Sequence, residues 1–136
     1  MGRCCMAKES KVPLDWFKKA EVDLKSAKIL LDNEILETAA FHIQQAIEKY
    51  LKGYLLSKGW KLIRTHDLIS LLNDAVSRES HFEAFRELCV RATEYYIEDR
   101  YPFLISSQLS VEELEEIREE TKVFANFVKK EAGRPK

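Results

Sequence analysis

Residues 35–58 read ILETAAFHIQQAIEKYLKGYLLSK, and this stretch decides the fold. Its apolar residues recur at the three- and four-residue spacing of one helix face. They are Leu36, Ala40, Ile43, Ile47, Tyr50, Leu51 and Tyr54. Gly59 follows, and a glycine just past such a pattern commonly ends a helix. We therefore predict a long amphipathic helix over residues 35–58.

The segments on both sides of this stretch carry the same helical period. It predicts helices over residues 14–32 and 82–99, and a short helix after Thr65, which is a suitable N-cap. Ser110 and Glu113 have the spacing of a capping box, which indicates the start of a last helix. No segment shows a convincing alternation of apolar and polar residues. We expect an all-α fold, an up-and-down antiparallel bundle of four main helices plus one short helix.

The totals predict one globular domain without a general affinity for nucleic acid. The 136 residues are 46% hydrophobic, enough for a single core. We expect a flexible tail over residues 1–12, the helical domain over 13–131 and a second tail over 132–136. The net charge is −1, so the protein has no global positive field. Any site for RNA or a nucleotide must therefore be local.

Several classes of site and location are disfavoured by the sequence. Cys4, Cys5 and Cys89 do not suggest a disulfide framework, which favours a reducing, cytoplasmic location. No window approaches the roughly 18 uninterrupted apolar residues of a membrane span, so we expect a soluble protein without a membrane partner. The three histidines lack metal-ligand spacing, and phosphate-binding and dinucleotide-binding glycine motifs are missing. We predict no metal and no cofactor.

A polar stripe runs beside the apolar face of the long helix. Gln44, Glu48 and Lys52 stand one turn apart, and polar groups so close to a core need partners. Glu48 and Lys52 could instead form an ordinary exposed pair contributing about 0.3–0.5 kcal/mol. Gly53 lacks a side chain, so another backbone or a ligand could approach it, or the helix could loosen there.

Three residues elsewhere are candidates to join this stripe. Asp23 lies on the inward side of the first helix, where it either fixes helix register through a neighbouring Lys, Arg or Tyr or joins a polar cluster. His66 lies near a helix start, which suits structural capping or a neutral ring beside an anion. Arg100 can pair with helix carbonyls or a carboxylate, or clamp a phosphate.

Four short motifs connect these residues to a known family. They read Ala20-x-x-Asp23-Leu24-x-x-Ala27, Phe41-x-x-Gln44-Gln45-Ala46-x-Glu48-Lys49-x-Leu51-Lys52, Thr65-His66-Asp67-Leu68 and Arg100-Tyr101-Pro102. In order and spacing, over about residues 13 to 130, they resemble the HEPN domain family. The resemblance implies an up-and-down helical bundle, usually a homodimer, often encoded beside a minimal nucleotidyltransferase and associated with nucleotide or RNA binding.

The resemblance also implies a possible ribonuclease activity, which this sequence disfavours. Many family members are metal-independent ribonuclease toxins in which a His follows an Arg by about four to six residues. Arg91 and Arg100 are followed by no histidine at all, and one residue separates Arg64 from His66. Arg78 is separated from His81 by two residues, which is also too short a spacing. Without the pair, the enzyme interpretation becomes the alternative.

We interpret the chain as a HEPN-like partner module that binds a nucleotide or RNA and acts with a nucleotidyltransferase in a toxin-antitoxin-type system. Lys52, His66 and Arg100 are expected to hold the ligand. Gln44, Glu48 and Asp23 are expected to orient those three residues. The alternatives are a metal-independent endoribonuclease toxin and a purely structural homodimeric interaction protein.

Self-association has independent support from apolar residues off the main helix faces. Val22 and Ile29 on the first helix are such residues, and the connector at residues 103–105 is apolar as well. Isologous dimers commonly cover such surface. We therefore expect a homodimer.

Overall fold

The structure is a computed structural model that describes residues 10–100 and 109–135. In chain order its elements are α1 (Pro13–Asp32), α2 (Leu36–Ser57), α3 (Leu68–Arg78), the 3-10 helix η2 (Ser80–Phe85), α4 (Arg86–Arg100) and α6 (Val111–Ala132). The described residues contain no strand. The predicted all-α bundle is therefore confirmed.

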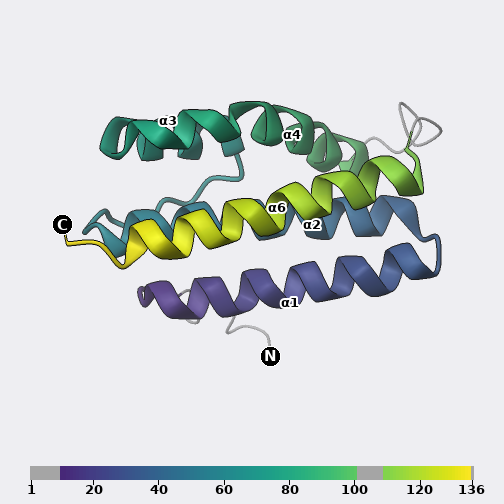
Figure 1. Ribbon diagram of the computed structural model, residues 1–136, viewed down its shortest axis with the longest axis horizontal. Helices are drawn as coiled ribbons and strands as arrows, with labels where there is room; N and C mark the ends of the chain where they lie inside the picture. The colour runs from purple at the N-terminus through teal and green to yellow at the C-terminus, as the bar shows by residue number, and fades with distance from the viewer. Residues whose placement is uncertain (1–9, 101–108, 136) are drawn as a thin grey trace.

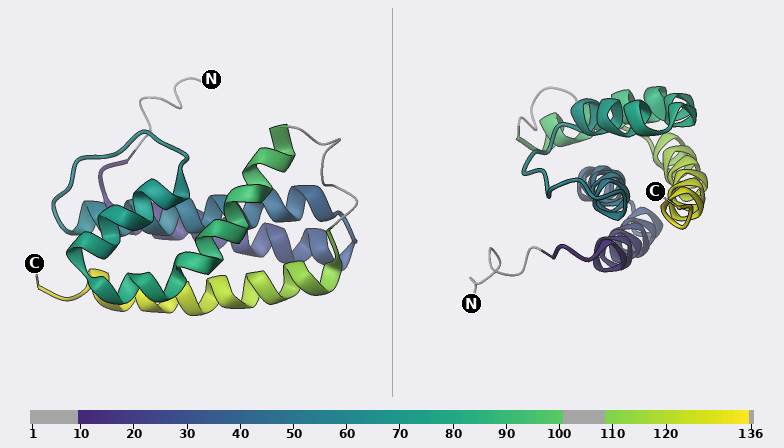
Figure 2. Two further views of the ribbon diagram at one scale, coloured as in Figure 1. Left: turned by 90° about the horizontal axis from the view of Figure 1, so that it is seen from above. Right: turned by 90° about the vertical axis from the view of Figure 1, so that its left-hand side faces the viewer.

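The helices form three layers. α1 and α2 make an antiparallel hairpin, and α6 packs along α2 (Figure 1). α3 and α4 cover the side opposite α1, with α4 crossing obliquely when seen from above (Figure 2). The hairpin turns at residues 33–35, where Glu34 has a φ of 58°. α2 consequently contacts α1, α3, α4 and α6 and forms the centre of the molecule.

The core surrounds α2 and takes in buried residues from every helix of the bundle. Residues of the predicted apolar face of α2, such as Ile43, Ile47 and Leu51, are fully buried. At one end, the ring of Tyr54 lies 4.5 Å from that of Phe82, centroid to centroid, and Phe82 lies 4.9 Å from Phe127. Tilted and edge-on aromatic pairs at these separations stabilise a core beyond the area they bury. The long helix thus anchors the bundle, as its sequence pattern predicts.

Helix starts differ from the expectation at two places. The N-cap of α3 is Asp67 rather than Thr65, because the Asp67 side chain accepts hydrogen bonds from the backbone N–H groups of Ile69 and Ser70. The helix expected over residues 82–99 is divided into η2 and α4, because Glu79 is extended and its side chain accepts from the N–H of His81. That cap starts a tight 3-10 turn before the α-helix begins.

The start of the first helix lies close to the end of the last helix. Val12 and Pro13 at the start of α1 line the same hollow as Ala132 and Gly133 at the end of α6. The expected tails fall partly on residues 1–9 and 136, which lie outside the described residues, so the domain boundaries stay a prediction.

Crossing a bilayer requires a helix that is both long and apolar. In the described parts of the chain, no helix combines the length and apolar character that a membrane crossing requires.

Candidate functional site

A buried carboxylate on α2 is the centre of the candidate site. The Glu48 side chain is only 4% exposed. Its Oε2 accepts a hydrogen bond from Nζ of Lys52 at 2.9 Å, and its Oε1 lies 3.1 Å from Nδ1 of His66. Because a carboxylate can only accept, Nδ1 is the protonated ring nitrogen of His66. We call Glu48, Lys52 and His66 the Glu48 cluster.

The ammonium of Lys52 has an aromatic neighbour as well as the carboxylate. Its Nζ lies 5.7 Å from the ring centroid of Trp16 on α1, within the range of a cation–π contact. The indole is held in turn, since its Nε1 donates to the carbonyl of Ser10 at 2.7 Å. The Lys52 side chain is 8% exposed. An ordinary exposed helix pair is therefore excluded for Glu48 and Lys52.

His66 reaches the cluster from the loop at residues 58–67. This loop is fixed at both ends, because Gly59 ends α2 with a φ of 89° and Asp67 caps α3. A positive φ of this size is easy for glycine and strained for other residues. The contact with Glu48 holds the ring of His66 at Nδ1. Because the His66 side chain is 57% exposed, the ring is still accessible to a ligand.

Asp23 belongs to a different cluster. Its Oδ1 lies 2.8 Å from Nδ1 of His42, and its Oδ2 accepts from Nζ of Lys49 at 2.6 Å. These partners, within the described residues, are not those of Glu48. The sequence analysis did not predict His42 and Lys49 as partners of Asp23. The two residues lie seven positions apart on α2 and therefore share a helix face, which is a signal that the sequence contains. This arrangement links α1 to α2 and corresponds to the register role considered for Asp23.

Gln44 is buried one turn before Glu48. Its Oε1 accepts from Nε2 of the neighbouring Gln45 at 2.8 Å, while its own Nε2 has no hydrogen-bond partner among the described residues. The stripe of Gln44, Glu48 and Lys52 thus exists as predicted, with all three residues buried. The backbone of α4 ends at Arg100, but the Arg100 side chain lies outside the part of the chain that the structure describes. Its convergence with Lys52 and His66 stays a prediction.

Gly53 accommodates a neighbouring side chain. A Cβ at this position would lie 2.5 Å from Cε1 of Phe17 and 3.2 Å from the carbonyl oxygen of Pro13. Since α2 continues to Ser57, the glycine does not mark a loosening of the helix. It allows α1 to approach α2 closely, beside the contact between Trp16 and Lys52.

A metal centre finds no support in the described side chains. Among the side chains of residues 10–95 and 109–135, no group of three or more His, Cys, Asp or Glu residues could hold a metal ion.

Comparisons with known proteins agree with this architecture. A family model described as HEPN domain matches residues 14–131. The structure is similar to the crystal structure of TT1696 from Thermus thermophilus, with 26% sequence identity and a TM-score of 0.74. The similarity covers 88% of this chain and 97% of that one. No curated protein matches the chain.

Proposed function

This chain belongs to the HEPN domain family, and from that premise we propose that it is a partner module which binds a nucleotide or RNA at the Glu48 cluster. Family membership supports a nucleotide- or RNA-related module in general. In our proposal, Lys52 and His66 contact a phosphate or base, and Arg100 supplies a further cation. Gln44 and Glu48 orient these groups, and Asp23 sets the register of α1 against α2.

One observation carries the proposal, namely an accessible imidazole attached to a buried ion pair. Glu48 and Lys52 are almost wholly removed from water, and such a pair returns little net stability because desolvating both charges is costly. His66 contacts Glu48 from the surface loop, and its side chain is more than half exposed. Charged groups held rigidly beside an accessible ring are suited to binding a polar ligand, since little side-chain entropy remains to be lost.

Titration with nucleotides tests the proposal directly. ATP, GTP and short RNAs are added to the protein at up to millimolar concentration while backbone amide shifts are recorded. We expect the largest shifts near Lys52 and His66, and weaker binding by His66→Ala. His81→Ala is the matched control, because the His81 side chain is 82% exposed and its ring pairs with Glu79, outside the cluster. Unshifted amides near Lys52 and His66 would contradict the proposal.

The same RNA samples distinguish the two alternatives. Cleavage that is lost in His66→Ala, with folding unchanged, would assign a metal-independent endoribonuclease toxin. Complete absence of a ligand response together with loss of stability in His66→Ala would assign a purely structural role.

We further propose that the chain forms a homodimer and acts with a nucleotidyltransferase in a toxin-antitoxin-type system. Val22 and Ile29 support self-association, because they lie seven residues apart on one face of α1 with exposures of 61% and 63%. Val22→Glu should shift sedimentation toward the monomer. Val123→Glu is the control, because this α6 valine is 62% exposed on another helix.

The proposed heteromeric partner has its own test. A small nucleotidyltransferase encoded beside this chain should co-purify with it after co-expression. Separate elution of the two proteins at micromolar concentration would argue against the partnership.

A further inference from the structure

The loop that carries His66 is locally basic. Residues 58–66 include Lys58, Lys61 and Arg64 and no carboxylate, although the whole chain has a net charge of −1. A hollow of about 510 Å³ opens on this loop. It is lined by Lys11, Leu56, Gly59, Trp60, Lys61, Leu62 and Arg64. We call it the Trp60 hollow, and its charged lining residues are all cations.

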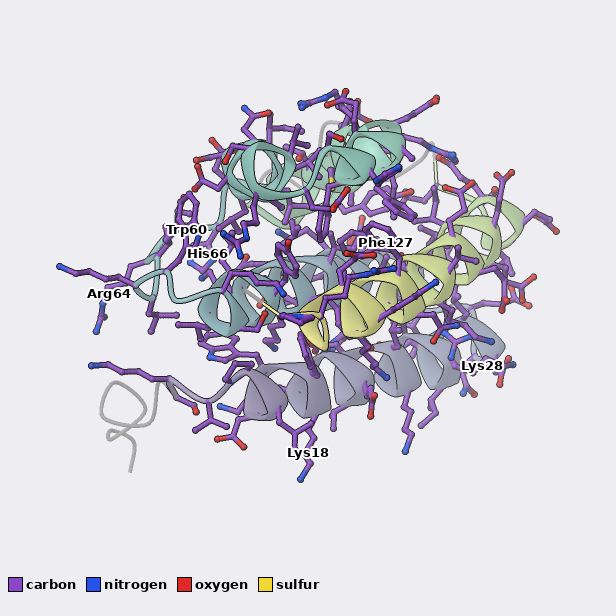
Figure 3. All side chains as sticks on the ribbon, turned by 60° about the vertical axis from the view of Figure 1, so that its left-hand side comes forward. Lys18, Lys28, Trp60, Arg64, His66 and Phe127 are labelled. Atoms are coloured by element: carbon purple, nitrogen blue, oxygen red, sulfur yellow. The ribbon has the colours of Figure 1, made fainter. Side chains whose placement is uncertain are left out.

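An aromatic ring is presented in this hollow. The Trp60 residue is 36% exposed, so part of it is accessible from the solvent. Its backbone is fixed, because its N–H donates to the carbonyl of Leu55 at 3.1 Å. Lys61 and Arg64 are exposed on the same loop, and Arg64 reaches outward from it (Figure 3). An accessible aromatic ring among cations is an arrangement that can stack a base and neutralise its phosphates.

The Trp60 hollow adjoins the Glu48 cluster. Leu56 lines the hollow and follows Lys52 by one turn on the same face of α2, a step of about 6 Å along the helix axis. Trp60 and His66 also come from the same loop, at the same end of the bundle as Arg64 (Figure 3). A ligand long enough to leave the Glu48 cluster in this direction would therefore reach the Trp60 ring.

We propose that the Trp60 hollow binds a second nucleotide of a single-stranded RNA whose first nucleotide occupies the Glu48 cluster. Trp60 stacks on a base, while Lys61, Lys11 and Arg64 contact phosphates. The inference rests on the proposed function and extends it from a mononucleotide to a strand. Stacking on one face and contacts to the backbone do not depend on base identity, so the hollow is expected to tolerate different sequences.

Fluorescence tests the inference with two probes, UMP and an oligouridylate of about eight nucleotides, a length that one binding module can cover. The oligouridylate should quench the emission of Trp60, identified by comparison with Trp60→Phe. Trp60→Ala should weaken its binding at least about five-fold, the lower end of the effect of removing one stacked base. Trp60→Phe keeps a ring and should bind within about two-fold of the unchanged protein.

Charge is tested separately by Lys61→Gln. This change should lower the slope of log affinity against log salt by about 0.7, the value for one contact to a single-stranded phosphate. Lys28→Gln is the matched control, because Lys28 pairs with Asp32 near the far end of α1 (Figure 3). It should leave the slope unchanged.

Failure of this inference is distinguishable from failure of the proposed function. If UMP shifts the amides near His66 while Trp60→Ala and Lys61→Gln bind the oligouridylate like Lys28→Gln, the extension is wrong and the first site stands. If the oligouridylate quenches Trp60 without shifting those amides, the two sites are not connected and the inference is overturned. Agreement of both readouts supports it.

Discussion

The contact between Gly53 and Phe17 shows how one missing side chain positions two helices. Any Cβ at residue 53 would lie closer to the Phe17 ring than normal contacts allow. The sequence allows the close approach of another backbone or a ligand at this glycine, or a loosening of the helix, and it cannot say which of these occurs. That choice depends on which face of α1 meets α2, which only the folded arrangement supplies.

Gly53→Ala should therefore destabilise the protein, although alanine normally favours a helix. Overpacking of this kind costs about 1–3 kcal/mol. Urea unfolding followed by circular dichroism measures the loss, and Phe17→Leu in the same chain should recover part of it. Gly133→Ala is the control, because a Cβ there has its nearest neighbour at 3.6 Å. Equal stability of the two alanine variants would contradict the proposed clash.

The ion pair of the Glu48 cluster provides a second residue-scale prediction. Glu48→Ala leaves the Lys52 ammonium buried without its carboxylate, so we expect a loss of about 3–5 kcal/mol in the free energy of unfolding. Replacing both residues, as Glu48→Leu with Lys52→Met, should restore most of this loss. Glu119→Ala breaks the exposed pair with Lys122 and should cost under about 1 kcal/mol. Urea unfolding of the set decides, and similar losses in the two single variants would argue against a buried pair.

At the scale of helices, periodicity and capping predict different features. The periodic pattern places α1 and α2 within a few residues of their ends, because a buried face must repeat with the helical period, while the capping box at Ser110 places the start of α6. It does not resolve where α3 starts, since Thr65 and Asp67 are both suitable caps. The break between η2 and α4 is also hidden, because Phe82 and Phe85 satisfy a 3-10 and an α spacing equally well.

The cap of α3 can be tested by substitution. Asp67→Ala removes the carboxylate that accepts from Ile69 and Ser70, and should cost about 0.5–2 kcal/mol. Asp74→Ala removes the same group from the body of α3 and should change stability by no more than about 0.5 kcal/mol. Thermal unfolding compares the two. A loss for Asp74→Ala as large as for Asp67→Ala would show that the effect is one of charge rather than capping.

At the scale of the whole molecule, burial in the core favours the neutral forms of one thiol and two tyrosine hydroxyls. Burial raises the pKa of the Cys89 thiol from 9.0 to about 12, and Arg86 opposes this shift. Burial also raises the pKa of Tyr50, with Glu21 adding to the effect, and that of Tyr54, where Arg78 opposes it. In the unfolded chain these groups ionise more readily than in the folded one.

Stability should consequently fall in alkaline solution. A raised pKa in the folded state gives stability that is fully present below the unfolded pKa of Cys89, 9.0, and is lost as pH rises toward about 12. Urea unfolding at a series of pH values above neutrality measures this loss. Cys89→Ala should be less stable at neutral pH but lose less on the alkaline side. An unchanged midpoint throughout the series would contradict the prediction.

The candidate site was only partly predictable from the sequence, because local spacing pairs residues of one helix but not residues of different elements. Glu48 and Lys52 lie one turn apart, so local spacing is enough to pair them. His66 reaches them through a loop, which the family motif anticipates and periodicity does not. Trp16 contacts Lys52 from another helix, and no local sequence pattern predicts a cation–π contact across a helix interface. For Asp23, the inward position was predictable from the sequence, but the residues that it contacts were not.

The hollow shared by the start of α1 and the end of α6 has a practical consequence. A short linker could join those two ends, so that the chain could be circularly permuted and reopened between Gly59 and Asp67. All helices would remain continuous in such a permutant, but the segment bearing Trp60 and His66 would be cut. We expect the permutant to keep its helical content by circular dichroism and to lose the RNA binding that we propose, which would separate folding from recognition in a single rearranged gene.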